Sequence, residues 1–311
     1  MHKHQIDTMD LSKRNWRWFL LVPALLVSGI AIAAVLRSTP EIRQDVAPTD
    51  TAATTANDSE SDSQTPRTRP SSIAEVLDLA SAALKSSESS LNDYTARFAK
   101  QERDASGNLT EKTEMNIKIQ TRTRNESNDA PMRIYLNFSA PQSTAGREVI
   151  WGRDLYDGKM AVHETSMLLS WKTVWLDPTG MLAMAGQRYP IWEIGLVRLI
   201  EKLIERGQRD LDNPDVTVTI TRDHEFDGRQ CELIQAVRSQ PGGGEDDFSL
   251  AEIVYDPERL LILSYQSFGW PSEGEEEVPL LESYQYRDLK TNVGLTEADF
   301  DVVNEAYGYP K

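Results

Sequence analysis

The sequence predicts an α+β domain that is mostly β, with about eleven antiparallel strands and a few helices. Hydrophobic residues recur at every second position in about eleven short segments, which is the period of a strand with one buried face. Two other stretches carry them every three to four positions, as an amphipathic helix does. The order is a helix, six strands, a helical block and five strands. The 241 residues of 71–311 are enough for one such domain.

A stretch of nineteen residues without a charged side chain, Trp18 to Leu36, precedes this domain. It is long enough to cross a bilayer once as a helix. Basic residues are concentrated before it, so the N-terminus is expected in the cytoplasm and the rest of the chain outside. Residues 1–37 are therefore predicted to hold a membrane anchor that begins with Trp18 and Phe19 and ends at Leu36. The alternative is a signal peptide cleaved near Ala31 to Ala33.

The composition after the anchor limits the partners. Residues 38–70 are rich in Thr, Ser, Asp and Pro, with few large hydrophobic side chains, so they are expected to form a disordered linker. Beyond residue 37 the chain carries 28 Lys and Arg against 47 Asp and Glu. Such a surface repels phosphate backbones, which excludes nucleic acid as a partner. Cys231 is the only cysteine, so no internal disulfide forms, and its place in an alternating segment predicts a buried thiol.

Local signals place the helices. Ser72 and Glu75 have the spacing of a capping box, which predicts a helix from Ile73 into the polar cluster at 86–90. The helical block is expected over 180–186 and 191–206. Thr296 and Asp299 predict one short closing turn of helix.

The alternating segments fall into two groups of strands. Asp157-Gly158 and Asp227-Gly228 predict tight turns within these groups, since both pairs favour positive φ. The strands of the first group are expected at 94–98, 115–119, 132–138, 149–151, 155–160 and 171–176, and those of the second at 216–222, 230–238, 248–255, 260–268 and 280–288.

Several short motifs resemble known bacterial envelope proteins. The element order and the early Tyr94-x-Ala96-x-Phe98 strand resemble the LolA/LolB-like lipoprotein-carrier superfamily. Five motifs also resemble one family within this superfamily, which is known only as a domain of unknown function. They are Phe138-Ser139-Ala140-Pro141, Gly146-Arg147-Glu148-Val149-Ile150, Asp157-Gly158-Lys159-Met160, Leu176-Asp177-Pro178 and Arg188-Tyr189-Pro190-Ile191.

This resemblance covers residues 74–305 and implies a more specific fold. The superfamily has an incompletely closed antiparallel β-barrel with helices covering its concave face. Its apolar cavity holds lipid acyl chains in characterised relatives. The resemblance to this superfamily implies no catalytic residue.

A set of hydrophobic side chains is the candidate lining of such a cavity. On a curved sheet they would share one face and offer the apolar concavity that a lipid needs. The alternative is that they pack against the helices in a filled core, as such stripes ordinarily do. The candidates are Phe98, Ile117, Ile119, Ile134, Leu136, Phe138 and Trp151.

The chain offers little sign of catalysis. No nucleophile, metal or phosphate-binding motif is present, and His163 and His224 are expected at exposed strand ends. We therefore expect that the protein is not an enzyme and that it binds no cofactor. The leading hypothesis is a binder of lipid or lipoprotein acyl chains, tethered to the bacterial inner membrane through residues 18–36 and facing the periplasm. The alternatives are a regulatory module that binds an envelope protein partner and a hydrolase with an unrecognised site.

Overall fold

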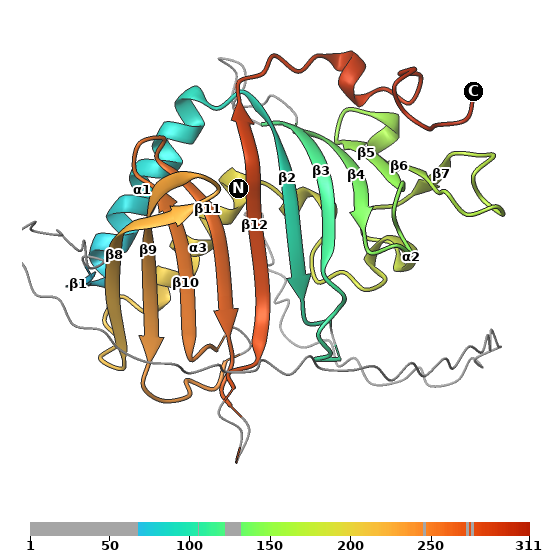
Figure 1. Cartoon of the computed structure of the whole chain (residues 1–311). Helices are drawn as coiled ribbons and strands as arrows, with labels where there is room; N and C mark the ends of the chain where they lie inside the picture. The colour runs from blue at the N-terminus through green and yellow to red at the C-terminus, as the bar shows by residue number, and fades with distance from the viewer. Residues whose placement is uncertain (1–67, 105, 122–131, 245–246, 272–273, 275–276) are drawn as a thin grey trace, which may run out of the picture. The chain divides into compact units, whose positions relative to one another are not determined.

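In the computed structural model, the described residues are 68–104, 106–121, 132–244, 247–271, 274 and 277–311. They contain one open antiparallel sheet of twelve strands, in the order β1-β8-β9-β10-β11-β12-β2-β3-β4-β5-β6-β7 (Figure 1). The mostly-β class and the unclosed antiparallel sheet are confirmed, with twelve strands where about eleven were predicted. The strands are β1 Thr68–Ser71, β2 Asp93–Glu102, β3 Thr113–Gln120, β4 Arg133–Ala140, β5 Glu148–Gly152, β6 Met160–His163, β7 Val174–Leu176, β8 Val216–Phe226, β9 Arg229–Arg238, β10 Leu250–Asp256, β11 Leu261–Phe268 and β12 Leu280–Thr291.

The additional strand is β1, which forms an edge of the sheet. It pairs antiparallel with β8, and Thr68 lies opposite Thr221. Pro70 has no amide hydrogen to donate, which an edge strand tolerates. The domain therefore includes at least three residues before the predicted boundary, because Thr68–Ser71 pair with a distant strand.

The first helix, α1 (Ile73–Ser90), begins where Ser72 predicts. The Ser72 hydroxyl accepts a hydrogen bond from the Glu75 amide at 3.2 Å, as an N-cap does. The other half of the predicted capping box is wrong. The Glu75 carboxylate accepts hydrogen bonds from the Arg69 guanidinium at 3.0 Å and the Ser71 hydroxyl at 2.7 Å. A cation on β1 thus draws this carboxylate away from the helix amide.

The second helical block is divided into shorter pieces than predicted, and its last helix ends at Arg209 where Arg206 was expected. It consists of α2 (Met181–Met184), a 3₁₀ turn at Ile191–Glu193 and α3 (Leu196–Arg209). Gly195, at φ 125°, interrupts the helix expected over 191–206.

Two buried tyrosines then supply acceptors for the start of α3. The Gly195 amide donates to the Tyr286 hydroxyl at 3.1 Å, and the Leu196 amide donates to the Tyr94 hydroxyl at 3.0 Å. The first amides of a helix have no partner within the helix, so these bonds fix its start. Burial raises the pKa of both phenols, so they stay protonated.

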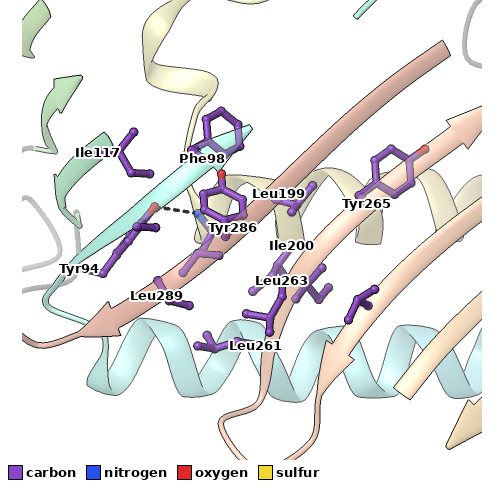
Figure 2. Close-up of a cluster of buried hydrophobic side chains, with 14 of the residues drawn as sticks. Tyr94, Phe98, Ile117, Leu199, Ile200, Leu261, Leu263, Tyr265, Tyr286 and Leu289 are labelled. Atoms are coloured by element: carbon purple, nitrogen blue, oxygen red, sulfur yellow. Dashed lines mark hydrogen bonds between the residues drawn. The ribbon is translucent and has the colours of Figure 1, made fainter. Parts of the chain in front are cut away.

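Both long helices pack on one face of the sheet, called here the helix-covered face. Figure 2 shows Leu199 and Ile200 of α3 among Leu261 and Leu263 of β11, with Tyr94 and Tyr286 beside them. The opposite face is covered over β4–β6 by the C-terminal segment, where Phe300 and Tyr309 are buried. That segment includes the predicted closing turn, a 3₁₀ helix at Glu297–Phe300 with the Thr296 and Asp299 capping box in place.

The predictions for two turns and for the cysteine can be compared with the structure. Asp227 and Gly228 have φ of 53° and 73° in the β8–β9 turn, as predicted. Asp157 and Gly158 also have positive φ, but they belong to a 3₁₀ turn, so the strand expected over 155–160 begins only at Met160. Cys231 is buried as predicted, and burial raises the pKa of its thiol to about 11.

The predicted anchor, with Trp18, Phe19 and Leu36, lies outside the described residues, as does most of the predicted linker. Among the residues that the structure does describe, no helix combines the length and the apolar character needed to span a bilayer. The membrane anchor therefore stays a prediction.

Candidate functional site

A cavity of about 380 Å³ lies on the helix-covered face, between strands β2–β7, β11 and β12 on one side and α2, α3 and the segment that joins them on the other. Its apolar wall follows the strand register. One row of cross-strand partners runs across β4, β5, β6 and β7, each residue lying opposite the next. It consists of Leu136, Val149, Val162 and Val174. All four line the cavity, and Ala183 of α2 lines it as well. The sheet thus supplies a continuous apolar surface.

The seven predicted lining residues divide into two groups. All are on the helix-covered face, but only Phe98, Leu136 and Phe138 line the cavity. The others are buried in the core outside the lining and are Ile117, Ile119, Ile134 and Trp151.

The second group is buried because of what covers its end of the sheet. Ile119, Ile134 and Trp151 form the next row, in register with Tyr94. The start of α3 packs over this row through Tyr94, and the Trp192 ring centroid is 5.7 Å from that of Trp151. Coverage by the start of α3 therefore closes this row. Ile117 lies opposite Leu136 in the row that lines the cavity and is itself buried outside the lining.

A wall of polar side chains, called here the polar wall, faces the cavity beside Phe98. It consists of Lys100, Glu102, Arg206, Tyr265, Glu282 and Tyr284.

Hydrogen bonds connect these groups. The Tyr284 hydroxyl donates to Glu102 Oε1 at 2.6 Å, and it lies 3.0 Å from Glu282 Oε2. Arg206 Nη1 donates to Glu282 Oε1 at 2.6 Å and to the Tyr265 hydroxyl at 2.8 Å. Burial and the two nearby carboxylates raise the pKa of Tyr284, and burial raises the pKa of Tyr265 to about 12, so both phenols remain neutral. Tyr284 acts as a donor, and Tyr265 accepts from Arg206.

Charges on the cavity wall are matched. Among the described lining residues there are four cations and four carboxylates, each cation within salt-bridge distance of a carboxylate. The wall is therefore polar without an excess of either charge. The pairs are Lys100–Glu102 at 3.3 Å, Arg147–Glu164 at 2.8 Å, Lys202–Glu193 at 2.9 Å and Arg206–Glu282 at 2.6 Å.

The polar wall was missed by the sequence prediction. Lys100 and Glu102 continue the alternation of Phe98 along β2, so they had to face the same side, but charged residues at such positions are ordinarily exposed. Glu282 and Arg206 come from other elements, and their pairing is a product of the fold. The sequence did contain a sign of the polar wall, because Lys100 and Glu102 follow the apolar residues of β2 at the same alternate positions.

The prediction that His163 is exposed is wrong. It lies at the end of β6 and is buried, with its ring centroid 5.8 Å from that of Tyr309. The C-terminal segment, whose packing no local pattern reveals, covers it. Within the described ranges, no group of three or more His, Cys, Asp or Glu side chains is arranged to hold a metal ion.

Comparisons with known proteins place the chain in a family. A family model described as "Protein of unknown function (DUF1571)" matches residues 91–309, which confirms the resemblance to a family of unknown function. A search of the curated proteins finds no match.

Solved structures give distant similarities. A DUF1329 family protein from Desulfovibrio piger is 12% identical with a TM-score of 0.35, covering 74% of this chain and 97% of that one. A LolA superfamily protein from Nitrosomonas europaea is 8% identical with a TM-score of 0.27, covering 71% and 97%. MucB, solved in complex with MucA, is 14% identical with a TM-score of 0.36, covering 74% and 59%. Because these TM-scores are below 0.5, we base the function on the cavity alone.

Proposed function

We propose that the chain, which belongs to the DUF1571 family of proteins of unknown function, binds the acyl chain of a lipid or lipoprotein in its cavity. The observation that carries this proposal is the amphipathic lining of the cavity. A row of aliphatic side chains forms one wall and a hydrogen-bonded polar wall adjoins it. An amphiphile has the same two parts.

The size and lining of the cavity fit such a ligand. Binding sites for small molecules occupy roughly 300–1,000 Å³ and are mostly apolar with a few placed polar groups. At about 380 Å³ the cavity lies within this range. Leu136, Val149, Val162 and Val174 offer no hydrogen-bonding group to a ligand, so water is held weakly against this row and an acyl chain would displace it.

The polar wall would orient the ligand. Neutral and charged hydrogen-bonding groups lie at one end of the lining, on Tyr265, Tyr284, Glu102 and Arg206. Because the lining cations and carboxylates are matched, an anionic group would compete with a resident carboxylate. The lining therefore suits an uncharged or zwitterionic group beside the acyl chain.

The proposed location follows from the sequence. Residues 18–36 would hold the protein in the bacterial inner membrane, and residues 38–67 would tether the domain on the periplasmic side. The domain would then handle lipids or lipoproteins close to the membrane that anchors it. This is a binding function and requires no reaction at the site.

Filling the cavity tests the proposal. Ala183 of α2 lines the cavity and is half-buried, so Ala183→Trp would place an indole in the space without removing a core side chain. The matched control is Val237→Trp on β9, where the native side chain is 45% exposed and lies outside the lining. The full chain and both variants would be purified identically, and their organic extracts would be measured by mass spectrometry together with titration of a fluorescent fatty acid.

We expect Ala183→Trp to lower bound lipid and weaken fatty-acid binding at least tenfold, and Val237→Trp to change neither. Lipid that adheres to the predicted anchor would be equal in all three proteins, so only the difference counts. Equal lipid content and equal affinity in a folded Ala183→Trp variant would overturn the proposal.

A further inference from the structure

Exposed hydrophobic side chains occur on two segments that each contribute a residue to the cavity lining, the segment before β7 through Leu169 and α2 through Leu182. They are defined here as the apolar rim, which consists of Met167, Leu168, Trp171, Met181 and Leu182. Met167 and Met181 are 92% and 88% exposed, and Trp171 is 69% exposed. Single exposed hydrophobic residues are common, but a group of large ones marks an interaction surface.

The rim lies in a segment with almost no charge. Between residues 165 and 187 the only charged side chains are Lys172 and Asp177, whereas the whole chain carries a net charge of −16. Acidic side chains, which would oppose contact with phospholipid headgroups, are thus nearly absent here. The Lys172 ammonium lies 5.3 Å from the centre of the Trp171 ring. A tryptophan beside a lysine is typical of the interface between a bilayer and water.

Several backbone groups near the rim are hydrogen-bonded within their own segment. The Leu169 and Ser170 amides donate to the Ser166 carbonyl at 3.0 and 2.9 Å. The Trp171 indole donates to the Leu168 carbonyl at 3.0 Å. These three groups would keep their bonds if the rim entered an apolar medium, where an unpaired polar group is costly.

The rim is continuous with the cavity. Leu182 is 75% exposed and also lines the cavity, next to Ala183 in the lining. On the other segment, Leu169 lines the cavity beside the exposed Leu168. An apolar path thus leads from the surface into the space between sheet and helices, so whatever covers the rim also meets the mouth of the cavity.

We propose that the apolar rim docks on the surface of a lipid bilayer, with Met167, Trp171 and Met181 entering the interface between headgroups and acyl chains. A bilayer is the partner that matches an uncharged, apolar surface at the mouth of an apolar cavity. Docking brings the cavity mouth against the acyl region and excludes water from the path. This goes beyond binding within the cavity, because the rim would dock whether or not the cavity is filled.

Fluorescence quenching tests this docking in the full chain. The variant Met167→Cys would be labelled with the fluorophore NBD and reconstituted in phosphatidylcholine vesicles that contain nitroxide-labelled acyl chains. Cys231 is buried, and unlabelled wild-type protein taken through the same reaction measures any background. The matched control is Val303→Cys, whose native side chain is 72% exposed on the C-terminal segment.

We expect the nitroxide to quench NBD at position 167 several-fold more than at position 303. The double substitution Leu168→Asp and Met181→Asp, at exposed positions that folding tolerates, should abolish this difference. Ala183→Trp should leave it in place, so docking and cavity binding can fail separately. Equal quenching at 167 and 303 would overturn the proposal. So would shielding of position 167 that depends on protein concentration and not on lipid, since that would identify a second copy of the chain as the partner.

Discussion

Strands β8–β11 and strands β2–β7 both present alternating hydrophobic side chains to the helix-covered face, yet they leave very different amounts of space. Over β8–β11, α1 and α3 pack directly on the sheet and leave a space of about 70 Å³. Over β2–β7 and β12, α3 is joined by α2, which has only four residues, and by irregular segments, and the cavity reaches about 380 Å³. The same strand pattern therefore gives a core where α1 and α3 lie side by side on the sheet and a cavity where a short helix and irregular segments take the place of α1.

The boundary between the two halves is a buried ion pair. Arg206 and Tyr265 border both spaces, and Arg206 pairs with Glu282 at 2.6 Å. A charged group at this position needs its partner, because a buried charge without one is costly. The pair thus divides the filled half from the hollow half and supplies the polar wall of the cavity.

Truncation of one leucine in each half should produce the largest difference between the two halves. Leu263 on β11 is 1% exposed and is packed in the filled half (Figure 2), whereas Leu136 on β4 borders the cavity. We expect Leu263→Ala to lower the free energy of unfolding by about 4 kcal/mol, since it leaves a new void in a packed core. Leu136→Ala should cost about 2 kcal/mol or less, because part of its surface already faces open space. Urea unfolding of the full chain measures both, and equal losses would contradict the division.

Much of the fold follows from local sequence, and the remainder depends on contacts between distant residues. Alternation located most strands from Tyr94 to Tyr286, except that the strand expected over 155–160 lies at Met160–His163, and Ser72 located the start of α1. The start of α3 was missed because two tyrosine hydroxyls on β2 and β12 supply its cap. Strand β1 was missed because Thr68–Ser71 carry no hydrophobic alternation and include a proline, and their partner is the distant strand β8.

The candidate site was predicted in part for a related reason. Alternation shows which side chains share a face, and it correctly placed Phe98, Leu136 and Phe138 together. It does not show how much helix covers each row, so Ile119 and Ile134 could not be separated from them. Nor does it reveal that Glu282 pairs with a cation on a helix. This ion pair is what allows the Glu282 carboxylate to be buried.

Removal of the cation at the boundary should have the next largest effect. Arg206→Met would leave Glu282, whose side chain is 3% exposed, without its closest positive charge, and we expect a loss of about 3 kcal/mol in the free energy of unfolding. Adding Glu282→Gln should restore at least half of that loss, because the buried charge is then gone. Chemical unfolding of the two single variants and the double variant forms a complete cycle. Additive losses would show that the two groups do not depend on each other.

The smallest expected effect concerns the edge of the filled half, where β1 is tied to α1 by Arg69 and Glu75. Hydrogen bonds from Arg69 and then Ser71 lower the pKa of Glu75 from its ordinary 4.5 to about 2. A carboxyl group whose pKa is lowered by folding adds stability above its unfolded pKa, and that stability is lost as the pH falls through its folded pKa. Both side chains are more than one third exposed, so the effect is local and modest.

Hydrogen exchange at β1 measures this tie directly. At pH 7 we expect the β1 amides to exchange faster in Glu75→Gln than in the wild type. The difference should shrink as the pH falls from about 4.5 towards about 2, because the wild-type carboxylate is then protonated as well. Glu88→Gln, at an exposed position of the same helix, is the control and should leave the β1 amides unchanged. If Glu75→Gln also left them unchanged at pH 7, backbone pairing with β8 alone would hold this edge, and the closure of the filled half would rest on the sheet without help from α1.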